Sequence, residues 1–336
     1  MIMNAVMGEG RDAGVPVHYG DPAREQRILA NEAGLVDRSH RGVIAVPGED
    51  RLSWLHDLTT QYLHGDVSGT ELLFLSPHGH VEHHAVLADV DGTAWLDVEG
   101  APNGLLEYLH RMRFLLRVEP CDMSQEMSLY SLVGPEAALA GIDLGPVDEL
   151  PVPGPKFASA DLPKRPSVAY PVAPLPGGGF ARRMPYGIDL MLPRGSKYLD
   201  EIEVPWCGLW AFEAMRVEAH RPRLGFETDH KTLPAEVDWL ASAVHLDKGC
   251  YRGQETIARV HNLGRPPRRL VLLHLDGVDE ELPAVGSAVE LDGRAVGFVG
   301  TTVRHHELGQ VALAVLKRSV ADDAKLKIGA RAAAID

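Results

Sequence analysis

Cysteine is scarce in this sequence. Its three cysteines, Cys121, Cys207 and Cys250, are widely spaced and odd in number. Such a set does not suit the disulfide framework of a small secreted protein, so we expect a reducing compartment, the cytoplasm. No apolar run approaches the roughly 20 residues that a membrane-spanning helix requires, which predicts no membrane partner. The N-terminal residues also lack a basic segment followed by an apolar run, which predicts no signal peptide.

Positive charge is in short supply as well. The 336 residues include 33 Lys and Arg against 47 Asp and Glu, a formal net charge of -14. Nucleic acid is therefore excluded as the main partner, because phosphate binding requires a basic face; a small anionic ligand held by a few arginines is compatible. Nucleotide and serine-nucleophile signatures are missing too. "GGGF" at 177–180 has no Lys-Ser/Thr pair after it, and Ser131 has no nucleophile elbow around it.

The patterns that are present indicate an α+β protein. The composition is that of an ordinary globular chain, with 45% hydrophobic and 24% charged residues. Alternating residues predict a strand at 42–48 and a series of hairpins at 71–98, whereas helical spacing predicts helices at 49–63 and 102–120. Strands and helices alternate irregularly, which favours α+β over a doubly wound parallel sheet. Residues 1–16 are expected to be a loose tail.

Proline and glycine indicate the domain limits. Nine of the 24 prolines lie between 146 and 176, a density that excludes a central strand or a helix interior and predicts a surface excursion. A proline-rich docking segment is the alternative. After Pro266, short alternating strands with Asp-Gly turns and no long helix predict a small all-β domain at 266–336. The intervening residues, 17–265, are expected to form the α+β body.

One segment, "DKGCYRGQETIARV" at 247–260, places a cysteine in an unusual setting. Cys250 lies between two glycines and two cations, Lys248 and Arg252, and a helix is predicted from Gln254. A helix N-terminus and nearby cations favour a thiolate, so we expect Cys250 to be chemically active. The alternative is an unreactive cysteine in a turn.

Histidines gather in "HGHVEHH" at 78–84. On a strand, His80, Glu82 and His84 share one face and resemble a metal-ligand set. A zinc site usually draws a further ligand from elsewhere in the chain, so we favour solvated or ligand-contacting histidines and expect no metal.

An arginine at position 216 is the third candidate. Arg216 and Glu218 belong to a predicted helix but, two residues apart, do not share a face. A planar guanidinium suits a carboxylate or phosphate ligand. An intramolecular salt bridge is the equal alternative.

The octapeptide "KGCYRGQE" at 248–255, followed by "ARV", resembles the signature of the YgfZ folate-binding proteins. These are related to GcvT, the aminomethyltransferase of the glycine cleavage system. Further blocks, among them "AGLVDRSHRGVIAVPGEDRLSWLHDLTTQ" and "AFEAMRVEAHRPRLGFE", are similar to the family's blocks and occur in the same order. The resemblance implies a GcvT-like folate-binding body of two α+β subdomains with a small C-terminal β-barrel.

The resemblance also implies roles for individual residues. The hallmark cysteine corresponds to Cys250, and the motif is completed by Lys248, Gly249, Tyr251, Gly253, Gln254 and Glu255. Asp189 corresponds to the acidic residue that reads the pterin, and Arg216 is the candidate for folate or its glutamate tail. His83 and His84 stand where the transferases carry an acidic pair, and they remain candidates for folate contact.

The implied function is binding of tetrahydrofolate, or a derivative, in support of iron-sulfur cluster assembly or maintenance in client enzymes. Iron-sulfur client or assembly proteins are then the expected partners. The alternative is a tetrahydrofolate-dependent aminomethyltransferase or methyltransferase, and a scaffold that binds folate only structurally is a third possibility. A histidine can move a proton near neutral pH but supplies no fixed negative charge, so His83 and His84 disfavour aminomethyl transfer.

Overall fold

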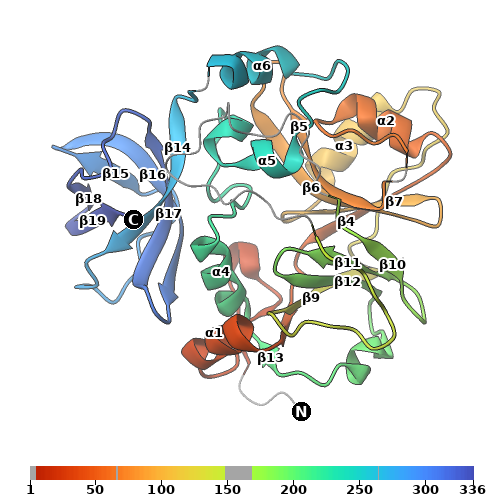
Figure 1. The fold of residues 1–336 in the computed structure, drawn as a ribbon, viewed down its shortest axis with the longest axis horizontal. Helices are drawn as coiled ribbons and strands as arrows, with labels where there is room; N and C mark the ends of the chain where they lie inside the picture. The colour runs from red at the N-terminus through yellow and green to blue at the C-terminus, as the bar shows by residue number, and fades with distance from the viewer. Residues whose placement is uncertain (1–4, 66, 148–168, 264) are drawn as a thin grey trace.

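The computed structural model describes residues 5–65, 67–147, 169–263 and 265–336 (Figure 1). Two mixed layers of sheet and helix form the body, and a closed barrel follows at the C-terminal end. The predicted α+β class with a small C-terminal β-barrel is confirmed. None of the helices in the described ranges is long and apolar enough to cross a membrane.

A five-stranded sheet with the order β5-β6-β7-β4-β8 forms one layer of the body. Its elements are β4 (Gly42–Pro47), β5 (Gly69–Leu75), β6 (Val81–Val90), β7 (Thr93–Val98) and β8 (Cys121–Asp122), with helices α2 (Arg51–Leu58) and α3 (Asn103–Met112). The predicted hairpin series is present: β5, β6 and β7 pair antiparallel in sequence order. Phe74 on β5 packs in the cluster that holds Leu55 of α2 and Leu109 of α3, so the helices bury one face of this sheet.

The other layer is a six-stranded sheet with the order β10-β11-β12-β9-β3-β13. Its strands are β3 (Gly34–Asp37), β9 (Met127–Val133), β10 (Val172–Pro174), β11 (Phe180–Met184), β12 (Gly187–Pro193) and β13 (Trp206–Cys207). Helices α1 (Pro22–Asn31) and α4 (Leu209–Glu218) pack beside it, with Leu29, Val36 and Phe212 in one core cluster.

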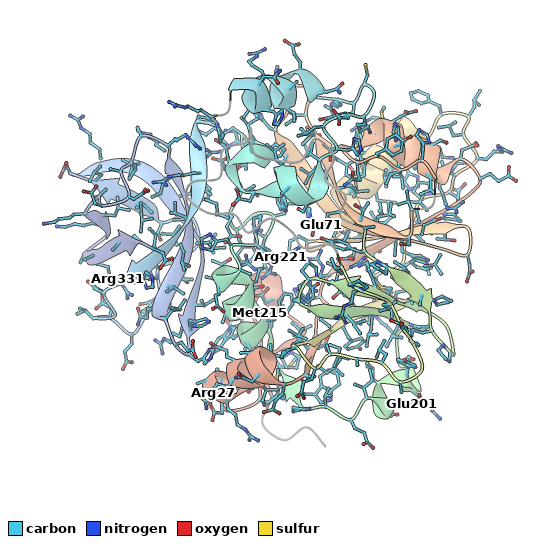
Figure 2. The ribbon with its side chains drawn as sticks, viewed as in Figure 1. Arg27, Glu71, Glu201, Met215, Arg221 and Arg331 are labelled. Carbon is cyan, nitrogen blue, oxygen red and sulfur yellow. The ribbon has the colours of Figure 1, made fainter. Side chains whose placement is uncertain are left out.

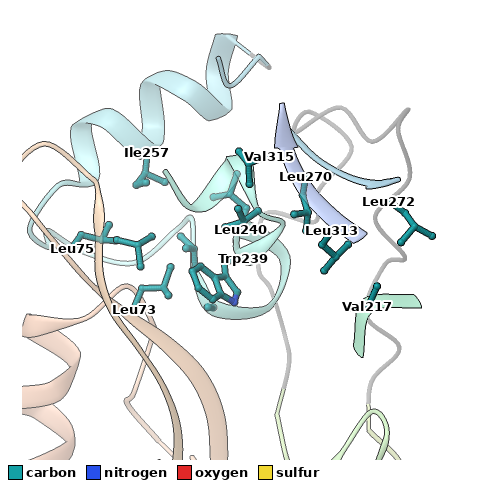
Figure 3. Packing of buried hydrophobic residues seen from close by; sticks show 14 of the residues in the cluster. Leu73, Leu75, Val217, Trp239, Leu240, Ile257, Leu270, Leu272, Leu313 and Val315 are labelled. Carbon is teal, nitrogen blue, oxygen red and sulfur yellow. The ribbon is translucent and has the colours of Figure 1, made fainter. Parts of the chain in front are cut away.

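The barrel closes with the order β14-β17-β16-β15-β18-β19. Its strands are β14 (Arg268–Leu275), β15 (Ala288–Leu291), β16 (Arg294–His305), β17 (Gly309–Lys317), β18 (Leu326–Ile328) and β19 (Arg331–Ile335). Helices α5 (Trp239–Ala243) and α6 (Gln254–Leu263) lie between barrel and body. Figure 3 shows how Leu73 of β5, Leu240 of α5, Ile257 of α6 and Leu313 of β17 meet in one apolar cluster.

Two predicted helices are shorter than their periodicity indicated. The helix expected at 49–63 ends at Leu58, and the one expected at 102–120 ends at Met112. Just beyond it, Phe114 adopts a positive φ of 47° that a helix cannot accommodate. The apolar residues after Met112 extended the helical pattern in the sequence, yet Leu115 is fully exposed.

The N-terminal residues also differ from expectation. In place of a loose tail, β1 (Val6–Met7) pairs with β2 (Pro16–His18), and Val15 is completely buried in the core cluster of α1 and α4. Short apolar residues among glycines gave no recognisable period in the sequence. Most of the proline-rich excursion predicted at 146–176 lies outside the described residues.

Candidate functional site

Cys250 is exposed on the loop that joins α5 to α6. Two exposed residues of this loop, Gly249 and Cys250, lie between two buried ones, Lys248 and Tyr251. Tyr251 packs in the apolar cluster between body and barrel, and the Lys248 ammonium lies 5.1 Å from the centre of its ring. The cysteine is therefore presented at the apex of a loop whose neighbours anchor it.

The Lys248 ammonium is buried and donates hydrogen bonds to three backbone carbonyls at the end of α2. The acceptors are His56, Thr59 at 2.7 Å and Gln61 at 3.2 Å. Burial lowers the pKa of Lys248 to about 8. All three donors of the ammonium are thus taken by backbone carbonyls.

Arg252 is directed elsewhere too. Its guanidinium pairs with Glu82 of β6 at 3.2 Å and lies over the ring of Tyr108 in α3. The sequence interpretation placed Lys248 and Arg252 as cations that favour the Cys250 thiolate. In the structure Lys248 binds carbonyls at the end of α2 and Arg252 pairs with Glu82, and a thiolate favoured by their charge stays a prediction.

The other residues of the motif shape the loop. The Gln254 side chain donates to the Lys248 carbonyl at 3.1 Å and closes the loop, whereas Glu255 is exposed and pairs with Arg259 along α6. Gly253 has a φ of +82°, and a Cβ there would lie 2.7 Å from the Gly79 Cα. The loop therefore docks directly on the His-Gly turn between β5 and β6.

His83 and His84 lie on β6 with their side chains on opposite faces. His83 is opposite Phe74 in the register and meets its ring edge-on, and burial lowers the pKa of this imidazole. His84 is opposite Leu73, stacks on Trp239 and reaches the Glu71 carboxylate at 3.2 Å. Among the described residues no group of three or more His, Cys, Asp or Glu is arranged to hold a metal ion.

Asp189 is buried on β12 and is surrounded by protein donors. Its carboxylate accepts hydrogen bonds from Ser131 at 2.6 Å, Tyr186 at 2.9 Å and Arg182 at 2.8 Å, with Arg38 at 3.2 Å. Arg182 is itself 1% exposed and bridges to Asp97 at 2.6 Å. A ligand that reads Asp189 must therefore take the place of one of these donors.

Arg216 is likewise occupied within the protein. Its guanidinium pairs with Glu213 at 2.7 Å and with Glu227 at 3.3 Å, and it donates to the Thr301 hydroxyl of the barrel strand β16. Gly300 lies against the Glu227 carboxylate, which would be 2.5 Å from a Cβ there. The salt-bridge alternative left open by the sequence is thus present in the structure, where it joins body to barrel.

A pocket of about 450 Å³ lies between the body and the barrel. It is lined by Gln26, Leu29, Ala30, Gly134, Pro135, Arg183, Pro185, Tyr186, Gly187, Ala211, Ala214, Met215, Glu218, His305 and His306. Met215 is labelled on α4 in Figure 2. The hydroxyl of Tyr186 reaches Asp189, so this residue belongs both to the pocket wall and to the buried carboxylate network.

Sequence reasoning missed a second buried carboxylate, Glu71. It accepts hydrogen bonds from Tyr170 at 2.6 Å, Arg221 at 2.7 Å and Ser242 at 2.9 Å, in addition to the contact with His84. Figure 2 shows Glu71 and Arg221 together at the centre of the molecule. A single acid in the apolar stretch "GTELLFL" was the available signal, because a charge in a fully buried strand requires partners.

Comparison with known proteins gives consistent results. A putative chloroplastic transferase of Arabidopsis thaliana is 28% identical over 94% of this chain and 72% of its own length. The aminomethyltransferase of Shouchella clausii is 28% identical over 94% of this chain and 88% of its length. That of Synechococcus elongatus is 29% identical over 85% and 77%, respectively. No protein-family model matches the chain.

The fold comparison agrees with the sequences. The crystal structure of the glycine cleavage system aminomethyltransferase T from Bartonella henselae superimposes with a TM-score of 0.76 at 19% identity. The match covers 98% of this chain and 92% of that structure. The chain is a homologue of the aminomethyltransferases and has the GcvT-like α+β fold with a closed C-terminal barrel.

Proposed function

We propose that this protein binds tetrahydrofolate, or one of its derivatives, and uses Cys250 to support assembly or maintenance of iron-sulfur clusters in client enzymes. The homology to aminomethyltransferases supports the folate part of this proposal. The octapeptide at 248–255, which resembles the YgfZ signature, supports the iron-sulfur part. Bound tetrahydrofolate supplies amine nitrogens that carry a one-carbon unit; the residues below would bind and orient it.

One observation supports folate binding above the others: Tyr186 lines the pocket, and its hydroxyl donates a hydrogen bond to the buried Asp189. A volume of about 450 Å³ lies in the range of small-molecule sites. The aminopyrimidine edge of a pterin presents N–H donors, which suit a carboxylate acceptor. We infer that these donors replace the Tyr186 hydroxyl on Asp189, since Tyr186 is the partner that faces the pocket.

Arg183 is better placed than Arg216 for the glutamate tail. Arg216 is committed to Glu213 and Glu227, and removing it leaves both carboxylates buried without their cation. Arg183 lines the pocket and donates to the Ala137 carbonyl at 3.2 Å, and it forms no ion pair with any residue of the described ranges. A guanidinium without a carboxylate partner suits the tail carboxylate.

Exposure of Cys250 supports the second part of the proposal. The thiol faces solvent while the residues on either side are anchored to α2 and to the β5–β6 turn. A fixed, accessible thiol suits contact with a partner protein's cluster or sulfur species, because it needs no rearrangement of the loop to be reached. Cys207 is completely buried and cannot serve this purpose.

Calorimetric titration with tetrahydrofolate, beside an assay of iron-sulfur enzymes in cells that lack the protein, tests both parts. The wild type is expected to bind and to restore enzyme activity. Arg183→Ala is expected to weaken binding and to keep its fold. Arg216→Ala is expected mainly to lower the free energy of unfolding, because it leaves Glu213 and Glu227 buried without their cation. Absence of binding by the wild type contradicts the folate part, whereas restored activity with Cys250→Ser contradicts the role of the thiol.

The alternative function is tetrahydrofolate-dependent aminomethyl transfer, which the names of the relatives favour. His83 and His84 oppose it, because an imidazole cannot supply the fixed negative charge of an acidic pair. Incubation with an aminomethylated lipoyl carrier and tetrahydrofolate is expected to give no methylenetetrahydrofolate above the uncatalysed rate. Product above that rate would establish the alternative.

A further inference from the structure

Three consecutive apolar side chains, Phe114, Leu115 and Leu116, are exposed on the loop that follows α3. Their exposed fractions are 79%, 101% and 40%. Among the other described residues, large exposed apolar side chains occur singly or, at Val6 and Met7, as a pair. A contiguous group of this kind marks an interaction site, whereas scattered exposed apolar residues are ordinary. We call Phe114, Leu115 and Leu116 the apolar tip.

The loop that carries the apolar tip is held in place at both ends. Arg113 pairs with Glu119 at 2.7 Å across its base, and Arg117 pairs with Asp50, the residue before α2, at 2.9 Å. Phe114 has a φ of 47°, a strained backbone that persists only where the surroundings fix it and that is frequent at functional sites. The loop therefore presents its apolar side chains to solvent in a defined position.

Side-chain contacts along α3 connect the apolar tip to the cysteine loop. The Arg111 and Arg252 guanidinium groups lie 5.7 Å and 5.8 Å, respectively, from the centre of the Tyr108 ring. Arg252 follows the exposed Cys250 by two residues, and Arg111 precedes Phe114 by three. We call Tyr108, Arg111 and Arg252 the α3 strip. The strip leads from the thiol to the tip.

The α3 strip is cationic on an acidic protein. Arg111 is exposed and forms no ion pair with any residue of the described ranges, and Arg252 is shared only with Glu82 at 3.2 Å. The chain as a whole has a formal net charge of -14. Carboxylates on a partner would therefore complement these two guanidinium groups.

A partner protein suits this surface better than a bilayer or a second copy of the chain. Glu119 and Asp50 lie beside the tip and would face anionic headgroups if the tip entered a membrane. Two copies of the chain, each with a net charge of -14, repel each other. A stable protein interface takes roughly 800 Å² from each partner. Three side chains supply less than this, so a partner must cover the tip and the strip together.

We propose that the apolar tip and the α3 strip form the docking surface for the iron-sulfur protein that Cys250 serves. The partner presents an apolar cleft that receives Phe114 and Leu115, and carboxylates at its rim pair with Arg111 and Arg252. Docking in this way holds the partner against the exposed thiol. The inference rests on the proposed function for the identity of the partner, and it adds the surface by which that partner is recognised.

Leu115→Asp tests the surface, because Leu115 is fully exposed and the fold does not depend on its side chain. The variant is expected to keep the wild-type free energy of unfolding, tetrahydrofolate affinity and rate of Cys250 labelling by iodoacetamide. In cells that lack the protein, it is expected to restore iron-sulfur enzyme activity about tenfold less than the wild type, the loss of one interface anchor.

Val278→Asp is the control, since Val278 is 81% exposed after barrel strand β14. This variant is expected to restore activity as the wild type does. Full restoration by Leu115→Asp overturns the proposal, and so does an equal loss in both variants.

Photo-crosslinking in cells identifies the partner. p-Benzoylphenylalanine replaces Leu115 or, as the control, Val278, and mass spectrometry identifies the adducts. An iron-sulfur enzyme or assembly protein is expected at position 115 and not at position 278, and Arg111→Glu is expected to lower the yield of this adduct about tenfold. Adducts only with a second copy of the chain or only with lipid overturn the proposal, as does the absence of any adduct.

The two experiments separate the docking surface from the proposed function. If the wild type restores no iron-sulfur enzyme activity, the proposed function is contradicted and the adduct at position 115 decides the surface. An iron-sulfur protein in that adduct supports docking, and any other protein overturns it. If the wild type and Leu115→Asp restore activity equally, the function stands and the docking surface is refuted.

Discussion

Gly79 and Gly253 pack backbone against backbone, which fixes the Cys250 loop on the turn between β5 and β6. A Cβ on Gly253 would lie 2.7 Å from the Gly79 Cα, and one on Gly79 would lie 2.8 Å from the Thr256 Cβ. Both backbones also have positive φ angles, +79° at Gly79 and +82° at Gly253. The contact joins the cysteine motif to the hairpin of β5 and β6, which carries His83 and His84.

Gly253→Ala is expected to lower the free energy of unfolding by about 1–3 kcal/mol, because the left-handed backbone and the contact with Gly79 both oppose a side chain. Gly249→Ala is the control: a Cβ at Gly249 meets nothing within 4 Å, so the change should stay within about 0.5 kcal/mol. Urea denaturation of the two variants measures the difference. Equal stabilities would show that the contact does not constrain the loop.

Cys250 is expected to react with iodoacetamide faster than the other two cysteines. Burial raises the pKa of Cys207 to about 12, and burial together with nearby acidic groups raises the pKa of Cys121. Both shifts lower the thiolate fraction of Cys121 and Cys207 relative to an ordinary cysteine. Peptide mass spectrometry over a pH series gives the three rates.

Complementation completes the cysteine test. Cys250→Ser should fail to restore iron-sulfur enzyme activity, whereas the double variant Cys121→Ser/Cys207→Ser should restore it in proportion to its folded fraction. If Cys250 labels no faster than Cys121, and Cys250→Ser still restores activity, the motif is only a turn that orients α6.

Lys248 is expected to make stability depend on pH. Its pKa of about 8 in the folded protein lies below the ordinary value of 10.5, so the folded state releases the proton first as the pH rises. Between these values the unfolded state holds more protons, and the free energy of unfolding increases with pH; the gain is lost as the pH falls through 8. Between pH 8 and pH 10.5 the free energy of unfolding of the wild type should therefore rise by up to about 3 kcal/mol relative to that of Lys248→Met.

Denaturation of both proteins at intervals from pH 7 to pH 10.5 measures this gain. Lys231→Met is the control, because Lys231 is exposed and its side chain meets water in both states. A constant difference between the wild type and Lys248→Met would contradict the prediction.

Asp189→Ala is expected to affect both stability and binding. The change removes the carboxylate between Arg182 and Arg38 and leaves these guanidinium groups buried without it, at a cost of about 3–5 kcal/mol. Tetrahydrofolate binding should weaken by about 1.5–3 kcal/mol, the range of a hydrogen bond to a charged group. Ser131→Ala, which removes one neutral donor to Asp189, should cost only about 1 kcal/mol of stability. Wild-type affinity in folded Asp189→Ala would contradict the pterin contact.

The sequence determined the features that depend on near neighbours along the chain. Alternating residues and Asp-Gly turns specified the hairpins of β5, β6 and β7, and the barrel was recognisable from short strands without a long helix. The start of α6 after Gly253 followed from a glycine that ends the loop and an acidic first turn. The cysteine motif could also be recognised from the sequence alone, because its eight residues are contiguous.

Only the tertiary structure decided what the charged groups contact. Lys248 binds the carbonyl of Thr59, which lies 189 positions earlier, and Glu71 meets Ser242, which lies 171 positions later. Local periodicity shows that a residue is buried but not which distant group enters its low-dielectric surroundings. A buried charge must find whichever partner the packing of the layers brings within hydrogen-bond distance. For this reason the sequence placed Lys248 beside the thiol, whereas the fold turned its ammonium to α2 and paired His84 with Glu71.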